Sequence, residues 1–103
     1  MKVIAVVPAR MASTRFPGKP LALIYGMPMI GHCYHRIRLV PGLANAYVAT
    51  CDEEIADYVR SIGGATVMTA TSHTRATTRT AEAVEIIERE TGEKFDVVVM
   101  VQG

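Results

Sequence analysis

The sequence predicts a doubly wound α/β fold of the Rossmann-like type, in which a mostly parallel sheet carries helices on both faces. Short apolar segments alternate with amphipathic helical segments along all 103 residues. The apolar segments are nearly continuous, as in parallel strands that are buried on both faces, and right-handed crossovers between such strands give a doubly wound sheet. Half of the residues are hydrophobic, which is enough for the core of one globular unit at residues 1–103.

The first half of the chain begins with a buried strand. Residues 2–8, KVIAVVP, are rich in β-branched side chains and end at a proline. Residues 21–26, LALIYG, fit either a short strand or an apolar link between turns. A helix is expected over residues 28–40, where apolar side chains recur at the spacing of one helical face. These side chains are Ile30, Cys33, Tyr34 and Ile37. Residues 45–50, NAYVAT, predict the second strand.

The next helix is expected within residues 50–64. Thr50 and Glu53 have the spacing of a capping box, and acidic residues crowd the first turn, where the helix dipole favours them. Gly63 and Gly64 then end the helix. Its apolar stripe consists of Ile55, Tyr58, Val59 and Ile62.

The last third of the chain repeats the alternation. Residues 65–69, ATVMT, predict a third strand, and residues 70–79, ATSHTRATTR, form a polar stretch without apolar periodicity. A third helix is expected over residues 80–92, followed by a strand over residues 95–102. Ligands of such sheets bind at the carboxyl ends of the strands, so the segments that follow the first, third and fourth strands should face one crevice.

The segment VVPARMASTRFPGK, residues 6–19, places Arg10, Arg15 and Lys19 directly after the first strand. Residues 1–51 contain six Lys or Arg and no Asp or Glu, although the net charge of the chain is only +1. The glycine patterns of a P-loop and of a dinucleotide-binding loop are both absent. The segment therefore indicates a phosphate clamp made by side chains. On charge and position alone, an exposed loop with solvated cations is an equal alternative.

The segment PARMASTRFPGKPLALIYGMPMI, residues 8–30, resembles the N-terminal signature of the sugar-acid cytidylyltransferases, above all of the 3-deoxy-manno-octulosonate (Kdo) type. It matches their patterns P-A-R-x-x-S-T-R-x-P-G-K-P-L and G-x-P-M-I, and VATCDEEIA, GGATVMT and VVVMVQG resemble later segments. The acylneuraminate type usually has Asn in place of Pro20. The spore-coat-polysaccharide type typically has Gln in place of Pro8. Both types are kept as alternative families.

The resemblance implies transfer of CMP from CTP to a Kdo-like sugar acid, with Mg²⁺ and release of pyrophosphate, in the synthesis of lipopolysaccharide or other cell-surface polysaccharide precursors. Arg10 and Lys19 would be the catalytic residues, because they would hold the triphosphate and stabilise charge that develops on it. The nucleotide-binding residues expected from the resemblance and from their places after the strands are Pro8, Ala9, Arg10, Arg15, Lys19, His73, Arg75, Thr77 and Gln102. An exposed, solvated histidine is an equal alternative for His73.

Residues 73–79, HTRATTR, depart from the family pattern H-x-S-G-T-[DE]-R. Arg75, Ala76 and Thr78 stand where the family has Ser, Gly and an acid. Alanine reaches glycine-like backbone angles less freely, and Arg75 adds a bulky cation. The departure leaves open how strictly the chain selects CTP.

In the family, the V-Q-G segment is followed by D-E-P, whose Asp binds magnesium, whereas this chain ends at Gly103. The sequence therefore predicts no metal ligand within the chain, and it predicts the N-terminal portion of a larger domain that is inactive by itself. The whole protein is expected to be a homodimer. A non-catalytic nucleotide-binding module and a truncated remnant remain alternatives.

Other partners are not expected from the composition. The charge is too small for nucleic-acid binding, and the absence of a long apolar segment argues against a membrane span, so a cytoplasmic protein is expected.

Cys33 and Cys51 are expected to be reduced thiols. His32 and His35 fit a partly buried helix face better than a metal site, because they would supply only two ligands.

Overall fold

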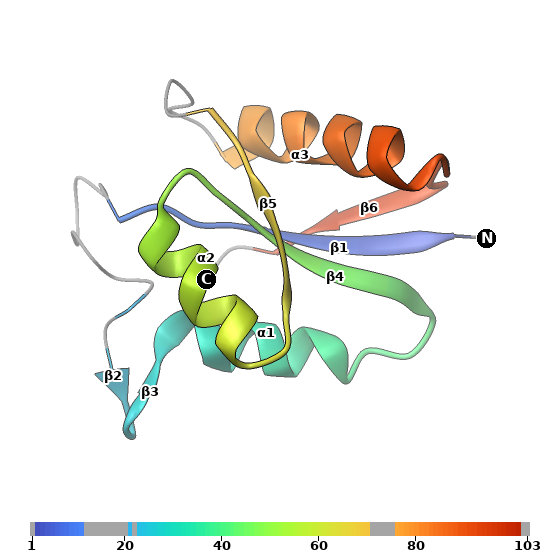
Figure 1. Ribbon diagram of the computed structural model, residues 1–103. Helices are drawn as coiled ribbons and strands as arrows, with labels where there is room; N and C mark the ends of the chain where they lie inside the picture. The colour runs from blue at the N-terminus through green and yellow to red at the C-terminus, as the bar shows by residue number, and fades with distance from the viewer. Residues whose placement is uncertain (1, 12–20, 22, 71–75, 102–103) are drawn as a thin grey trace.

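The computed structural model describes residues 2–11, 21, 23–70 and 76–101. Within them, strands and helices alternate in the predicted order (Figure 1). The elements are β1 Val3–Pro8, β2 Leu23–Ile24, β3 Met27–Pro28, α1 Met29–Arg38, β4 Leu43–Thr50, α2 Glu53–Ser61, β5 Ala65–Met68, α3 Ala76–Thr91 and β6 Val97–Met100.

Four parallel strands form the main sheet in the order β5-β4-β1-β6. Helices α1 and α2 lie on one face of this sheet and α3 lies on the other (Figure 1). Successive side chains of β1 therefore enter different cores: Ala5 and Val7 pack with α1 and α2, whereas Ile4 and Val6 pack with α3. This arrangement confirms the predicted doubly wound fold class.

Residues 23–28 form a small hairpin, which settles the ambiguity left by the sequence. Strands β2 and β3 pair antiparallel, and Leu23 lies opposite Pro28. The turn between them has φ of 52° at Tyr25 and 80° at Gly26. Two consecutive positive φ angles are typical of the tight turns that join hairpin strands.

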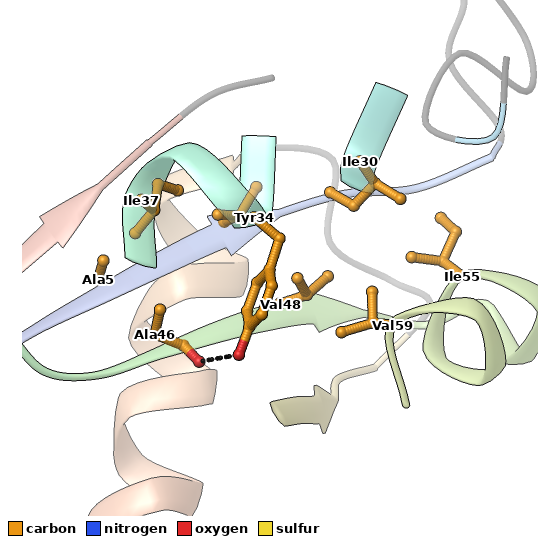
Figure 2. Packing of buried hydrophobic residues seen from close by; sticks show 9 residues of the cluster. Ala5, Ile30, Tyr34, Ile37, Ala46, Val48, Ile55 and Val59 are labelled. Atoms are coloured by element: carbon orange, nitrogen blue, oxygen red, sulfur yellow. Dashed lines mark hydrogen bonds between the residues drawn. The ribbon is translucent and has the colours of Figure 1, made fainter. Parts of the chain in front are cut away.

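Helix α1 follows directly after Pro28 and buries three of its four predicted stripe residues, Ile30, Tyr34 and Ile37. The buried hydroxyl of Tyr34 donates a hydrogen bond to the Ala46 carbonyl oxygen at 3.2 Å (Figure 2). It also accepts one from the Ala65 backbone nitrogen at 3.1 Å. One side chain thereby links α1 to β4 and β5.

We expect Tyr34→Phe to lower the free energy of unfolding by about 1–3 kcal/mol, because it leaves the Ala46 carbonyl and the Ala65 N–H without this partner. Urea denaturation followed by circular dichroism measures the change. Tyr25→Phe is the matched control, because the Tyr25 side chain is exposed. Equal stability of the wild type and Tyr34→Phe would show that neither bond contributes.

The predicted capping box at the start of α2 is wrong. The helix begins at Glu53 with Asp52 as its N-cap residue, and Thr50 is the last residue of β4 with a fully buried side chain. The Thr50 hydroxyl accepts a hydrogen bond from the Asp52 backbone nitrogen at 3.1 Å. The sequence placed Thr50 both at the end of the strand and at the start of the helix. It ends the strand as predicted, so the helix start moves by two residues.

Helix α3 begins at Ala76, four residues before the expected start at residue 80. The polar residues of this first turn were assigned to a loop because they lack apolar periodicity. Arg79 is nevertheless buried on the same side of the helix as Ala83 and Ile87, against β1, β4 and β5. In this first turn, the buried side of the helix thus carries the charged Arg79 and not the apolar side chain that a sequence pattern would reveal.

Candidate functional site at the carboxyl edge of the sheet

The carboxyl ends of the four parallel strands lie at one edge of the sheet, where backbone hydrogen bonds continue beyond the strand ends. The Ala9 nitrogen donates to Ala49 O at 2.9 Å, and the Thr69 nitrogen donates to Thr50 O at 2.9 Å. On the other side of β1, the Val101 nitrogen donates to the Val6 carbonyl oxygen at 3.0 Å. The chain segments that leave the sheet here therefore start from a rigid base.

Strand β1 lies at the point where the strand order reverses. The chain passes from β1 to β4 and β5 on one side and then returns to β6 on the other side (Figure 1). Ligands of doubly wound sheets bind at the carboxyl end of the sheet at such a point. The residues that follow β1 are therefore the best-placed ligand-binding residues of the described chain.

Pro8, Ala9 and Arg10 are the predicted nucleotide-binding residues that the structure places at this edge. Pro8 ends β1, and all three residues are partly buried. Among the residues that the structure describes, Arg10 takes part in no ion pair or side-chain hydrogen bond.

Of the other predicted site residues, the structure describes only Thr77. Thr77 lies in the first turn of α3 with an exposed side chain, so it belongs to a helix and not to the expected loop. The remaining predicted residues, among them the catalytic candidate Lys19, lie outside the described residues. The full set is Arg15, Lys19, His73, Arg75 and Gln102.

Asp52 is a neighbour of the basic segment that the sequence analysis missed. The segment has no acid near it in the sequence, yet the Met11 backbone nitrogen donates a hydrogen bond to Asp52 Oδ2 at 2.8 Å. Cys51 Sγ lies 3.7 Å from the same oxygen. The available signal was topological: Asp52 follows the strand that is adjacent to β1 in a doubly wound sheet.

Arg79 is a second residue whose role the sequence analysis missed. Its side chain is only 3% exposed, and its Nη1 donates to Thr69 Oγ1 at 2.5 Å and to Ala70 O at 3.4 Å. The Ala70 nitrogen in turn donates to Glu82 Oε1 at 2.8 Å. Side chains of α3 thus hold the end of β5, where the connection that contains His73 begins.

The described residues contain no group of three or more His, Cys, Asp or Glu that could hold a metal ion. His32 is partly buried and His35 is exposed on α1, and Cys33 and Cys51 are free thiols, as predicted. In the same part of the chain, no helix is long and apolar enough to cross a membrane.

Comparison with known proteins gives a consistent result. A family model described as Cytidylyltransferase matches residues 4–103. The 8-amino-3,8-dideoxy-manno-octulosonate cytidylyltransferase of a Shewanella species is 48% identical over 103 residues, which are 100% of this chain and 41% of the relative. The 3-deoxy-manno-octulosonate cytidylyltransferase of Geobacter metallireducens is 45% identical over 103 residues, again 100% of this chain and 38% of the relative.

Among solved structures, the structure of CMP:2-keto-3-deoxy-manno-octonic acid synthetase complexed with CTP superimposes with a TM-score of 0.83 at 37% sequence identity. The match covers 99% of this chain and 40% of that chain. It confirms the fold and the resemblance to the octulosonate cytidylyltransferases. The chain spans about two fifths of the length of the proteins it matches.

Proposed function

Since the chain belongs to the cytidylyltransferase family, we propose that it forms the nucleotide-binding part of an enzyme that transfers CMP from CTP to a Kdo-like sugar acid. The observation that carries the proposal is the likeness over 99% of the chain, at 37% identity, to a synthetase complexed with CTP. Pyrophosphate is the second product, and the activated sugar acid serves the synthesis of lipopolysaccharide or another cell-surface polysaccharide.

Arg10 has the chemistry that a triphosphate needs. Its guanidinium group can donate two parallel hydrogen bonds to phosphate oxygens, and its charge neutralises negative charge that develops on the leaving pyrophosphate. We assign the same task to Lys19 as a movable point charge, with Arg15 assisting. His73, Arg75, Thr77 and Gln102 complete the proposed set around the nucleotide. Positioning and charge supply most of the catalysis in such transfers.

The backbone at Pro8 and Ala9 supports a preference for cytosine. Pro8 has no N–H group, and the N–H of Ala9 is already bonded to the Ala49 carbonyl oxygen. These two residues therefore have no backbone donor to offer a base, and carbonyl acceptors are what remain. An acceptor pairs with the 4-amino group of cytosine and is repelled by the corresponding oxygen of uracil.

We accordingly expect the chain to bind CTP at least about tenfold more tightly than UTP, as for the loss of one buried hydrogen bond. Isothermal titration calorimetry with both nucleotides measures the ratio. No CTP binding at millimolar concentration would contradict the proposed function. Equal affinities would contradict the cytosine preference only.

Turnover is tested in a chimera, because the chain matches only 38% of the Geobacter metallireducens relative. Residues 1–103 of this chain replace the matching segment of that relative, and pyrophosphate release from CTP is measured with Kdo and with its 8-amino analogue. An active chimera supports catalysis, with the preferred acid reporting on the acceptor. A folded chimera that binds CTP but releases no pyrophosphate favours a non-catalytic nucleotide-binding module.

Mg²⁺ is part of the proposal for the whole enzyme, where carboxylate oxygens would hold the ion and the ion would neutralise part of the triphosphate charge. The described residues do not form a set of ligands that fits it, so no step is assigned to it here. On the strength of the resemblance, we also propose that the whole enzyme is a homodimer. We also propose that the enzyme acts in the cytoplasm, where CTP is supplied.

A further inference from the structure

The carboxylate of Asp52 occupies the N-cap position of α2 but makes no side-chain cap hydrogen bond. An Asp at this position normally accepts a hydrogen bond from an N–H group in the first helical turn. The backbone angles, φ −106° and ψ 119°, are those of an ordinary N-cap residue. Its carboxylate nevertheless accepts the Met11 N–H, 41 residues earlier in the chain. The Asp52 side chain therefore links two distant segments of the chain and does not cap its own helix.

That link holds the short stretch on which Arg10 sits. On one side of Arg10, the Ala9 nitrogen is bonded to the Ala49 carbonyl oxygen at 2.9 Å. On the other side, the Met11 nitrogen is bonded to Asp52 at 2.8 Å. The side chains of Ala9 and Met11 also pack against the core beneath α1 and α2. Both neighbours of Arg10 are thus fixed to the end of β4, which restricts the positions that its guanidinium group can reach.

We propose that Asp52 is a positioning residue for nucleotide binding, which directs Arg10 toward the triphosphate by holding the Met11 N–H. The proposal rests on the function proposed above. The hydrogen bond, and not the charge, of Asp52 would favour CTP binding, because a negative charge beside an anion site lowers the affinity for CTP. An amide oxygen at this place keeps the hydrogen bond without that charge.

Three substitutions separate this role from helix capping. Asp52→Ser supplies a good N-cap residue, but its shorter side chain does not reach Met11. Asp52→Asn is also a good N-cap residue and keeps an acceptor at the distance of the native oxygen. Asp52→Thr repeats the design of the serine variant if that variant does not fold.

We expect Asp52→Ser to unfold at nearly the wild-type temperature but to bind CTP about tenfold more weakly, because a misplaced binding group loses much of its effect. The affinity for CMP should change by less than about twofold, since CMP lacks the two outer phosphates. Asp52→Asn should bind CTP at least as tightly as the wild type. Calorimetric titration of both nucleotides, with a thermal scan of each variant, provides these data.

Amide hydrogen exchange at Met11 gives a measurement without nucleotide. Exchange should be slow in the wild type and in Asp52→Asn, and fast in Asp52→Ser. Wild-type CTP affinity in Asp52→Ser overturns the positioning role and leaves the proposed function intact. Equal losses of CTP affinity in the serine and asparagine variants also overturn it, because the hydrogen bond would then be irrelevant. A wild-type chain that does not bind CTP overturns the proposed function itself.

Discussion

Arg10→Ala should weaken CTP binding by about 10- to 100-fold, the loss of about 1.5–3 kcal/mol expected for a charge-assisted hydrogen-bonding group. Arg10 is partly buried at the end of β1, and within the described chain it has no ion-pair partner that would compete for its charge. A triphosphate bound here would accept charge-assisted hydrogen bonds from its guanidinium group. Calorimetric titration of the chain with CTP measures the effect.

Arg36→Ala is the matched control for this substitution, because Arg36 is an exposed arginine on α1. It removes the same charge from the chain and should change CTP affinity by less than about twofold at physiological ionic strength, where distant charges are screened. Arg10→Lys should recover part of the loss, since it restores the charge but not the paired donors. Equal effects of Arg10→Ala and Arg36→Ala would contradict a specific phosphate contact.

In the chimeric enzyme, the same substitution should lower kcat/KM by about 100-fold or more, because charge stabilisation on the triphosphate acts in the transition state as well. A fall in kcat at saturating CTP would show that Arg10 acts beyond ground-state binding. If only KM rises, Arg10 binds the nucleotide without assisting the transfer.

The sequence could predict the fold because its signals are local. The apolar runs identify the main strands, and the stripe around Tyr34 identifies α1 within two residues at each end. Gly63, with φ of 81°, marks the residue at which α2 gives way to β5. The sequence does not identify the hairpin, because its turn has Tyr25 at the first position, where Asn or Asp is the usual signal.

The part of the site that was missed consists of contacts between distant segments. Asp52 and Met11 are 41 residues apart, so no local pattern connects them. Arg79 looked like a loop residue because a buried arginine has no periodic signature. Arg79 matches the last position of the family pattern over residues 73–79, but its burial and its contact with Thr69 appear only in the folded chain. Positions of Pro8, Ala9 and Arg10 were predictable because they follow a strand whose end is fixed by the fold.

Arg79→Ala should be strongly destabilising, by about 2–4 kcal/mol, because it removes a buried charged donor from Thr69 and Ala70. Chemical denaturation measures the loss in free energy of unfolding. Arg89→Ala is the control on the same helix, and its exposed side chain predicts a change within about 0.5 kcal/mol. Arg79→Lys tests the geometry, since one ammonium group cannot reproduce the planar donor fork.

The same substitution should also affect the site, because α3 holds the end of β5 from which the connection with His73 starts. At a temperature where Arg79→Ala is still folded, CTP affinity should fall, whereas Tyr34→Phe, a destabilising change on the opposite face of the sheet, should leave it unchanged. A loss of stability without a loss of CTP affinity in Arg79→Ala would show that the base of this connection does not influence the nucleotide. A joint loss would show that Arg79 supports both the stability of the end of β5 and the affinity for the nucleotide.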